Sequence, residues 1–408
     1  MAEVAGDAGA VWLDGRRLQT GFKRYAGLGP NTYVAELAPA LDAEALPDAL
    51  RILVERGAEL VSRAPPSRFV EAPAAPGRGP WPTHLRQHLL LAAWLERQSP
   101  RALHFVSQTD APALLRVPTI LTVHDVVQHR QGEWYRPPPG VAQDRAIRLR
   151  MALVRALERR AIARARRIIV PSRVTAEELS ATLGVSRSRI AVIPEAASPR
   201  LRPEPAERDV AVRRRLALPE RYLLHPGGAD QRKRLPELVR VFDEIARTDA
   251  TLGLVLVGPV RSGDGAAELE RAIATAEASA RIRVCGVLDD ADLAAVYRAA
   301  RAVVLATRYE GFGLPVVEGF ACGIPVVATA APAIVEVAGD AALLVPVDDV
   351  RALVDAVKSV LEDPARAADL RARGLVRAAQ FRWGVAAVET LSVYEDVLGE
   401  SLGVRSSR

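Results

Sequence analysis

Two glutamates, Glu310 and Glu318, flank a glycine-rich turn in the segment EGFGLPVVEGF. Gly311 and Gly313 let the backbone approach a ligand closely, because glycine has no side chain. Pro315 suits the first turn of a helix, where its missing N–H and fixed φ cost nothing. The unbonded N–H groups at such a helix start suit phosphate or sugar oxygens. We therefore predict a ligand-binding turn, with Glu310 at the strand end and Glu318 one turn into the helix, where a carboxylate can bind a ribose diol.

A second turn of the same kind carries positive charge. The run LHPGG ends an expected strand, and Arg232 and Lys233 precede a helix expected from about Leu235. The chain contains only three lysines, and one of them stands in this turn. Both cations are placed to neutralise a pyrophosphate. Taken alone, however, a solvated basic turn explains so short a motif equally well.

The elements that must position these turns are short apolar strands alternating with helical stretches. Continuous apolar strands in such an alternation predict parallel sheets covered by helices on both faces. In open sheets of this class, ligands bind at the carboxyl ends of the strands, where both turns stand. The expected strands lie at 11–13, 103–106, 119–123 and 168–170 in the first half, and at 222–224, 252–257, 282–285, 302–305 and 325–328 in the second.

The length of 408 residues suits two domains rather than one core. Pro194, Pro199, Pro203 and Pro205 fall within a dozen residues without helical or strand periodicity, which is typical of a linker. We expect an N-terminal Rossmann-like domain at 1–196 and a C-terminal one at 197–385. A last helix in 386–408 is expected to return towards the N-terminal domain.

Composition excludes several classes of protein. The net charge of +6 permits anionic partners, but aromatic residues make up only 5% of the chain and no zinc-finger spacing is present. Nucleic acid is therefore not an expected partner. No apolar run is long enough to span a bilayer, and the start of the chain lacks a secretory pattern. The two cysteines form no disulfide or metal framework, so we expect a cytoplasmic protein.

Two short motifs imitate metal sites. His84 and His88 have the spacing of zinc ligands but lack the glutamate and the third ligand of that motif. Asp290 and Asp292 imitate a metal-binding Asp-x-Asp pair, but a helix is expected near Leu293, so we predict a capping role. No metal site is expected.

Residues 145–167 hold nine arginines against one glutamate on an expected helix. Such a helix can rest on anionic lipid. A solvated helix face in an arginine-rich protein is the favoured alternative.

Together these segments resemble glycosyltransferase family four, the group 1 glycosyltransferases, and do so along nearly the whole chain. The family signature is the glutamate pair within EGFGLPVVEGFACGIPVVAT. Further similar segments are PTILTVHDVV, RARRIIVPSRVTAEEL, SRIAVIPEAASP, GDAALLVPVDD and FRWGVAAVETLSVYEDVL. The resemblance implies the α/β fold called GT-B, in which two Rossmann-like domains with parallel sheets face each other across a cleft. It implies that the domain at 1–196 is the acceptor-side domain and that the domain at 197–385 binds the nucleotide sugar. It also implies a metal-independent enzyme that retains the anomeric configuration.

The resemblance implies four catalytic side chains. His124 would lie near the reacting sugar, and Glu310 would contact the transferred sugar. Arg232 and Lys233 would bind the pyrophosphate. Further donor contacts are implied at Gly27 or Gly29, Gly228, Val287, Phe312, Gly313, Leu314 and Glu318.

Within that set, Glu318 would bind the ribose, Val287 would lie near the base, and Gly27 or Gly29 would form a glycine loop facing the phosphates. Gly21 competes with that pair for the glycine loop. Many relatives have an arginine where this chain has Gly228, so one phosphate contact differs here.

The expected function is transfer of a hexose from a nucleoside diphosphate sugar to a glycan, a lipid-linked or a small-molecule acceptor, as in polysaccharide biosynthesis. GDP-mannose is the favoured donor and a UDP-sugar the next. The nucleotide sugar is a substrate, so no cofactor is expected. Peripheral contact with an anionic membrane, at its inner face, stays open. Two alternatives also stay open: a nucleotide-sugar epimerase of the same fold, and a non-catalytic protein that binds nucleotide sugars.

Overall fold

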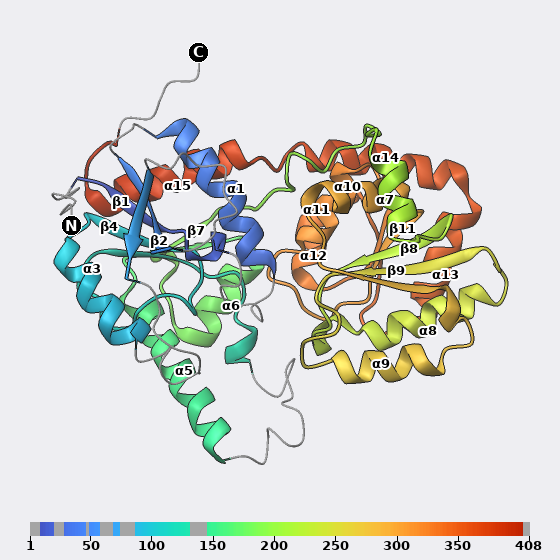
Figure 1. Ribbon diagram of the computed structural model, residues 1–408, viewed down its shortest axis with the longest axis horizontal. Helices are drawn as coiled ribbons and strands as arrows, with labels where there is room; N and C mark the ends of the chain where they lie inside the picture. The colour runs from blue at the N-terminus through green and yellow to red at the C-terminus, as the bar shows by residue number, and fades with distance from the viewer. Residues whose placement is uncertain are drawn as a thin grey trace. The chain divides into compact units, whose positions relative to one another are not determined.

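The computed structural model describes residues 9–19, 28–45, 49–57, 68–73, 86–130 and 145–402, which fall into two compact units (Figure 1). Among these residues, unit 1 holds 9–129, 145–195 and 383–402, and unit 2 holds 130 and 196–382. The chain therefore passes from unit 1 to unit 2 between Glu195 and Ala196, and returns to unit 1 between Arg382 and Trp383.

Unit 1 is built on a seven-stranded sheet in the order β3-β2-β1-β4-β5-β6-β7, in which every neighbouring pair is parallel. The strands are β1 (Val11–Asp14), β2 (Leu50–Glu55), β3 (Phe69–Ala72), β4 (Ala102–Phe105), β5 (Thr119–Thr122), β6 (Arg167–Val170) and β7 (Ile190–Val192). The helices are α1 (Leu28–Glu44), α3 (Ala92–Gln98), α5 (Arg145–Arg164), α6 (Arg173–Leu183) and α15 (Trp383–Leu398), with a π-helical turn at Arg86–Leu91.

The last helix belongs to unit 1. α15 packs along α1 and contacts β4 and β6. Trp383 and Tyr394 of α15 are buried, and their rings lie against Tyr33 and His104 respectively, at centroid distances of 5.7 and 5.6 Å. Burial of such aromatic side chains stabilises the fold by about 1.5–3 kcal/mol each. The core of unit 1 is therefore completed by the C-terminal segment of the chain.

Unit 2 contains a six-stranded parallel sheet in the order β10-β9-β8-β11-β12-β13. Its strands are β8 (Arg221–Pro226), β9 (Leu252–Val257), β10 (Ile282–Gly286), β11 (Ala302–Leu305), β12 (Val326–Thr329) and β13 (Leu343–Val345). Its helices are α7 (Asp209–Arg215), α8 (Leu235–Ala246), α9 (Ala266–Thr275), α10 (Asp290–Ala299), α11 (Leu314–Ala321), α12 (Pro332–Ala338), α13 (Val350–Glu362) and α14 (Pro364–Ala378).

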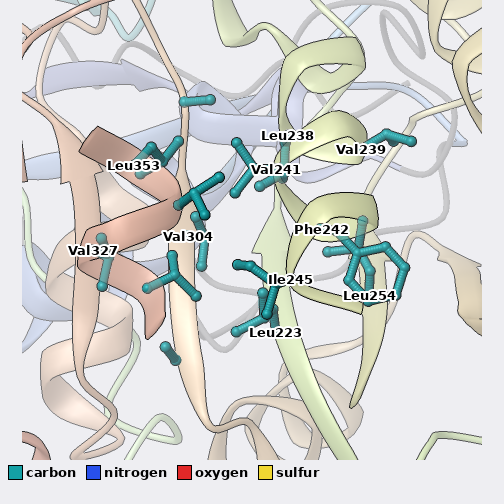
Figure 2. Close-up of a cluster of buried hydrophobic side chains, with 14 of the residues drawn as sticks. Leu223, Leu238, Val239, Val241, Phe242, Ile245, Leu254, Val304, Val327 and Leu353 are labelled. Atoms are coloured by element: carbon teal, nitrogen blue, oxygen red, sulfur yellow. The ribbon is translucent and has the colours of Figure 1, made fainter. Parts of the chain in front are cut away.

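The two faces of this sheet are covered by separate apolar clusters. α8, α9 and α13 supply one cluster, and α10, α11 and α12 supply the other. Figure 2 shows Ile245 of α8 beside Leu223 of β8, and Phe242 of α8 beside Leu254 of β9. Both faces of the strands are thus apolar, which explains the continuous hydrophobic runs in the sequence and confirms the predicted parallel α/β class.

In both units the strand order reverses next to the first strand of the unit. The reversal lies between β1 and β4 in unit 1 and between β8 and β11 in unit 2. Such a switch point, at the carboxyl ends of the strands, is where open parallel sheets bind ligands. The basic turn after β8 and the glutamate turn after β11 therefore leave the sheet on either side of the switch point of unit 2.

Candidate functional site

The structure brings together the basic turn and the first glutamate. Nη1 of Arg232 donates to Oε2 of Glu310 at 2.7 Å and to the backbone oxygen of Tyr309 at 2.8 Å. Nζ of Lys233 lies 3.7 Å from Oε1 of the same glutamate. The side chains of all three residues are 12–17% exposed. Two cations thus converge on one carboxylate at the switch point of the sheet.

The charge of Glu310 is held by these two cations. Burial by itself raises the pKa of a carboxyl group, but the nearby Arg232 and Lys233 outweigh burial here and lower the pKa of Glu310 to about 2. Glu310 is therefore ionised throughout the physiological range. An incoming phosphate would meet Arg232 and Lys233 already fixed in place.

Gly227 is a site residue that the sequence analysis passed over in favour of Gly228. It has φ +149°, and a Cβ at Gly227 would lie 2.8 Å from Nζ of Lys233. A Cβ at Gly228 would meet Cγ of Pro259 at 3.3 Å and no site residue among its three nearest atoms. Gly227 therefore leaves the space that Lys233 occupies. In the sequence this position is marked only by two adjacent glycines, which do not indicate at which of the two a side chain would be excluded.

The turn before α11 is shaped by Gly313. This residue has φ +101°, and an added Cβ would lie 2.5 Å from Cδ1 of Ile334. Gly313 is the N-cap of α11 and has no side chain with which to cap it, and Leu314 and Pro315 are the first helical residues. Phe312 is buried, and its ring meets that of Phe381 edge-on at a centroid distance of 5.7 Å. The turn therefore presents backbone rather than side chains, as a phosphate or sugar site at a helix start requires.

Glu318 lies one turn into α11, as predicted, but it is only 8% exposed. Its Oε2 accepts a hydrogen bond of 2.5 Å from the hydroxyl of Tyr297 on α10. Burial, followed by the charge of Glu318, raises the pKa of Tyr297 well above 10, so its hydroxyl stays a donor. Tyr297 was not predicted, because a tyrosine inside an amphipathic helix has no local mark that separates it from core.

Val287 directly follows β10, at the same edge of the sheet, and 57% of its surface is exposed. Gly286 before it has φ +70°. The adjacent Cys285 is a partly buried thiol whose pKa is raised by burial. An exposed apolar residue after a left-handed glycine is suitable for packing against a planar base.

His124 lies in unit 1, just beyond β5. Its Nδ1 lies 2.8 Å from Oε1 of Glu195, and its Nε2 lies 2.9 Å from the backbone oxygen of Val106. The ring of Tyr33 meets the histidine ring edge-on at a centroid distance of 5.0 Å. Glu195 lies 71 residues further along the chain, and only the fold brings the two residues together.

The two candidates for the glycine loop differ in what the structure shows. Gly29 is the second residue of α1 rather than part of a loop, and an added Cβ there would meet no atom of the described residues within 4 Å. Gly27 lies outside the described residues, as does the competing Gly21. No contact with the described residues would therefore exclude a side chain at Gly29.

In the two motifs that resemble metal sites, the described side chains contact other groups of the protein. His84 lies outside the described residues, and Nδ1 of His88 accepts from the backbone N–H of Ala113 at 3.1 Å. The cap of α10 is Asp289, whose side chain accepts from the N–H of Asp292 at 2.8 Å. The prediction that the Asp290 pair caps this helix was therefore wrong by one residue.

Asp292 is instead paired with Arg208 and Arg215. Within the part of the chain that the structure describes, no group of three or more His, Cys, Asp or Glu side chains could hold a metal ion. In the same part, no helix is long and apolar enough to cross a membrane.

Comparisons with known proteins match both halves of the chain to family models. Residues 211–376 match the family model "Glycosyl transferases group 1", and residues 29–200 match "Glycosyltransferase Family 4". The chain is 40% identical over 114 residues to O-antigen chain mannosyltransferase B of Escherichia coli, covering 28% of this chain and 30% of that protein. It is 33% identical over 249 residues to D-inositol 3-phosphate glycosyltransferase 1 of Catenulispora acidiphila, covering 58% and 59%. The chain thus spans less than two thirds of the length of these curated relatives.

A solved structure extends the likeness to nearly the whole chain. The Anabaena protein HepE in complex with UDP and glucose superimposes with a TM-score of 0.68, covering 95% of this chain and 99% of that one at 17% identity. At that identity the likeness concerns the fold alone, and it supports the GT-B architecture predicted from the sequence. With two parallel Rossmann-like sheets, the glutamate pair in its turn and both family models matched, the chain belongs to the group 1 glycosyltransferases of glycosyltransferase family four.

Proposed function

We propose that this protein transfers a hexose from a nucleoside diphosphate sugar to an acceptor hydroxyl, with retention of the anomeric configuration. The observation that carries the proposal is the meeting of Arg232, Lys233 and Glu310 at the switch point of unit 2, next to the turn that opens α11. Two fixed cations and a helix start form a site for a diphosphate.

The chemistry needs stabilisation of the charge on the departing diphosphate. Arg232 and Lys233 would supply it, together with the free backbone N–H groups at the start of α11, and no metal is required for this role. Glu310 would contact the transferred sugar while it holds both cations. The acceptor hydroxyl would attack from the face of the leaving group, and the diphosphate would take the proton of that hydroxyl.

The nucleoside of the donor would bind to other residues of unit 2. Glu318, held by Tyr297, would accept from the ribose hydroxyls, and the exposed Val287 would pack on the base. We favour GDP-mannose, because the Escherichia coli relative is named a mannosyltransferase. The complex of HepE with UDP and glucose makes a UDP-sugar the next candidate.

Calorimetry with free GDP, UDP and ADP tests the donor site before any acceptor is known. We expect one of the three to bind at micromolar concentration to the wild type and about 10–100-fold more weakly to Lys233→Ala, the loss typical of a charged hydrogen-bond partner. Arg247→Ala, an exposed cation of the same unit, is the matched control. Failure of all three diphosphates to bind would overturn the proposal.

Product analysis with the same protein sample distinguishes a transferase from the two alternatives, an epimerase and a non-catalytic binding protein. A transferase releases the nucleoside diphosphate from its donor and transfers the sugar to water or to an acceptor. An epimerase changes the sugar, and a non-catalytic protein returns the donor intact. Analysis of the products after incubation with GDP-mannose and with UDP-glucose therefore assigns the class.

We further propose that α5 contacts an anionic lipid surface. The buried residues of this helix are Glu158, Ala161 and Ile162, all in its last third. In its first half, Leu149 and Leu153 are 67% and 42% exposed on one face, and arginines surround them. A basic helix with an exposed apolar stripe is the composition that binds anionic interfaces.

Sedimentation with lipid vesicles tests this contact. The wild type should sediment with phosphatidylglycerol vesicles and not with phosphatidylcholine vesicles. The double variant Leu149→Ser/Leu153→Ser should lose most of this binding, whereas Val376→Ser, an exposed valine on α14, should not. Equal binding to both lipids, or no effect of the double variant, would exclude the contact.

A further inference from the structure

Both ring nitrogens of His124 face oxygen atoms that accept hydrogen bonds. The backbone oxygen of Val106, 2.9 Å from Nε2, can only accept, and so can an ionised carboxylate such as Glu195, 2.8 Å from Nδ1. The two bonds form together only when the His124–Glu195 pair holds two protons. With Glu195 as an ionised acceptor, both protons lie on the ring.

His104, on the neighbouring strand β4, provides the contrast. Its Nδ1 lies 2.7 Å from the hydroxyl of Tyr394, and its Nε2 lies 2.8 Å from the hydroxyl of Thr122. A hydroxyl can donate or accept, so a neutral ring satisfies both contacts. Burial, and after it the charge of His124, lowers the pKa of His104 to about 3. His104 is therefore neutral, and of the two rings only His124 has partners that require a charge.

The groups around His124 hold the ring in one orientation. Tyr33 of α1 packs on it edge-on, and burial raises the pKa of this tyrosine, so its hydroxyl is neutral. Asp125, next in the chain, uses Oδ1 to accept from the N–H of Val127 at 3.1 Å. Glu195 is buried, and it is the residue at which the chain leaves unit 1.

We infer that Glu195 is a positioning residue that keeps His124 doubly protonated and fixed by both nitrogens. In this state the ring has no lone pair with which to take a proton. With both ring nitrogens bonded within unit 1, His124 is not the base for the acceptor hydroxyl. This inference rests on the proposed transferase function for its kinetic consequence, but the protonation state does not depend on it.

Nitrogen-15 NMR of the full chain labelled at histidine tests the protonation state without any substrate. At pH 7 we expect one ring, assigned to His124 by its loss in His124→Gln, to show two protonated nitrogens. His104 should remain neutral. In Glu195→Gln at pH 7 the His124 ring should show only one protonated nitrogen, because the amide of glutamine can donate to Nδ1 instead of accepting from it. A neutral His124 ring at pH 7 in the wild type, or a ring that stays doubly protonated in Glu195→Gln, would overturn the inference.

Kinetics with the donor found by calorimetry tests the positioning role. Glu195→Gln should lower kcat about 10-fold or more, as the loss of a charge-assisted hydrogen bond does, and leave the KM for the donor within about twofold. The alkaline limb of its pH–rate profile should move to lower pH, and Glu195→Asp should recover part of the rate. Glu96→Gln, which alters a carboxylate that accepts from backbone N–H groups elsewhere in unit 1, should leave kcat unchanged.

Unchanged kcat and pH profile in Glu195→Gln would remove Glu195 from the mechanism. A wild type that is inactive with every donor would instead refute the proposed function. The NMR experiment would still test the protonation state of His124 in that case.

Discussion

Replacing Glu310 by glutamine tests how strongly the two cations of the candidate site hold this carboxylate. Glutamine has nearly the same shape as glutamate but carries no charge. A displacement of the pKa of Glu310 from 4.5 to about 2 corresponds to about 3 kcal/mol of favourable interaction, at about 1.4 kcal/mol per pKa unit. The folded state has the lower pKa, so this contribution is complete well above pH 4.5 and is lost as the pH falls towards 2.

We therefore expect Glu310→Gln to lower the free energy of unfolding of unit 2 by up to about 3 kcal/mol at pH 7. By the same linkage, the difference between wild type and variant should be about 1 kcal/mol smaller at pH 4. Hydrogen exchange in increasing urea, resolved by peptide over β8 and β11, measures unit 2 separately from unit 1.

Glu277→Gln is the control, because Glu277 pairs with Arg247 at the surface of the same unit, with both side chains at least 60% exposed. Such a pair contributes at most about 1 kcal/mol. If Glu310→Gln cost no more than Glu277→Gln at pH 7, or if its cost did not diminish between pH 7 and pH 4, the cations would not hold Glu310 as we reason.

Four further results are expected. Lys233→Ala should lower kcat/KM about 100-fold or more, because a fixed group that stabilises the leaving charge is lost; near wild-type turnover would contradict this. Glu318→Ala should weaken binding of the free nucleoside diphosphate by about 1.5–3 kcal/mol in calorimetry, and unchanged affinity would remove it from the ribose site. Gly313→Ala should destabilise unit 2 by about 2–4 kcal/mol, since it combines a left-handed backbone with a Cβ 2.5 Å from Ile334, whereas Gly384→Ala, with open space around it, should be neutral or stabilising. Transfer should persist in excess chelator, and loss of activity that magnesium restores would require a metal.

The sequence predicts the fold class well because the parallel sheets are buried on both faces. Their strands are continuous apolar runs, such as 252–257 and 302–305, which stand out without any knowledge of partners. The two turns of unit 2 are predictable for the same reason: each is marked by glycine and proline at a strand end. Their meeting at Glu310 then follows from the reversal of strand order between β8 and β11.

The contacts that depend on tertiary structure are not predictable in this way. Glu195 is distant from His124 in the sequence, and it follows a strand in a proline-rich segment typical of a linker. Tyr297 reaches Glu318 from a different helix. Gly227 and Gly228 are equivalent as sequence, and only the position of the Lys233 side chain distinguishes them. In each case a local pattern gives the residue type, while the partner is fixed by packing between elements.

The return of the chain to unit 1 through α15 has a consequence for synthesis on the ribosome. Apart from Arg130, the described residues of unit 2 run without a break from 196 to 382, and this segment can fold as soon as it has emerged. Unit 1 cannot, because the helix that covers α1 and contacts β4 and β6 begins only at Trp383. The apolar surface that α15 buries thus stays open to water, and to chaperones, during synthesis of the whole of unit 2. A chain truncated after residue 382 would therefore hold a folded second unit and an unfinished first one.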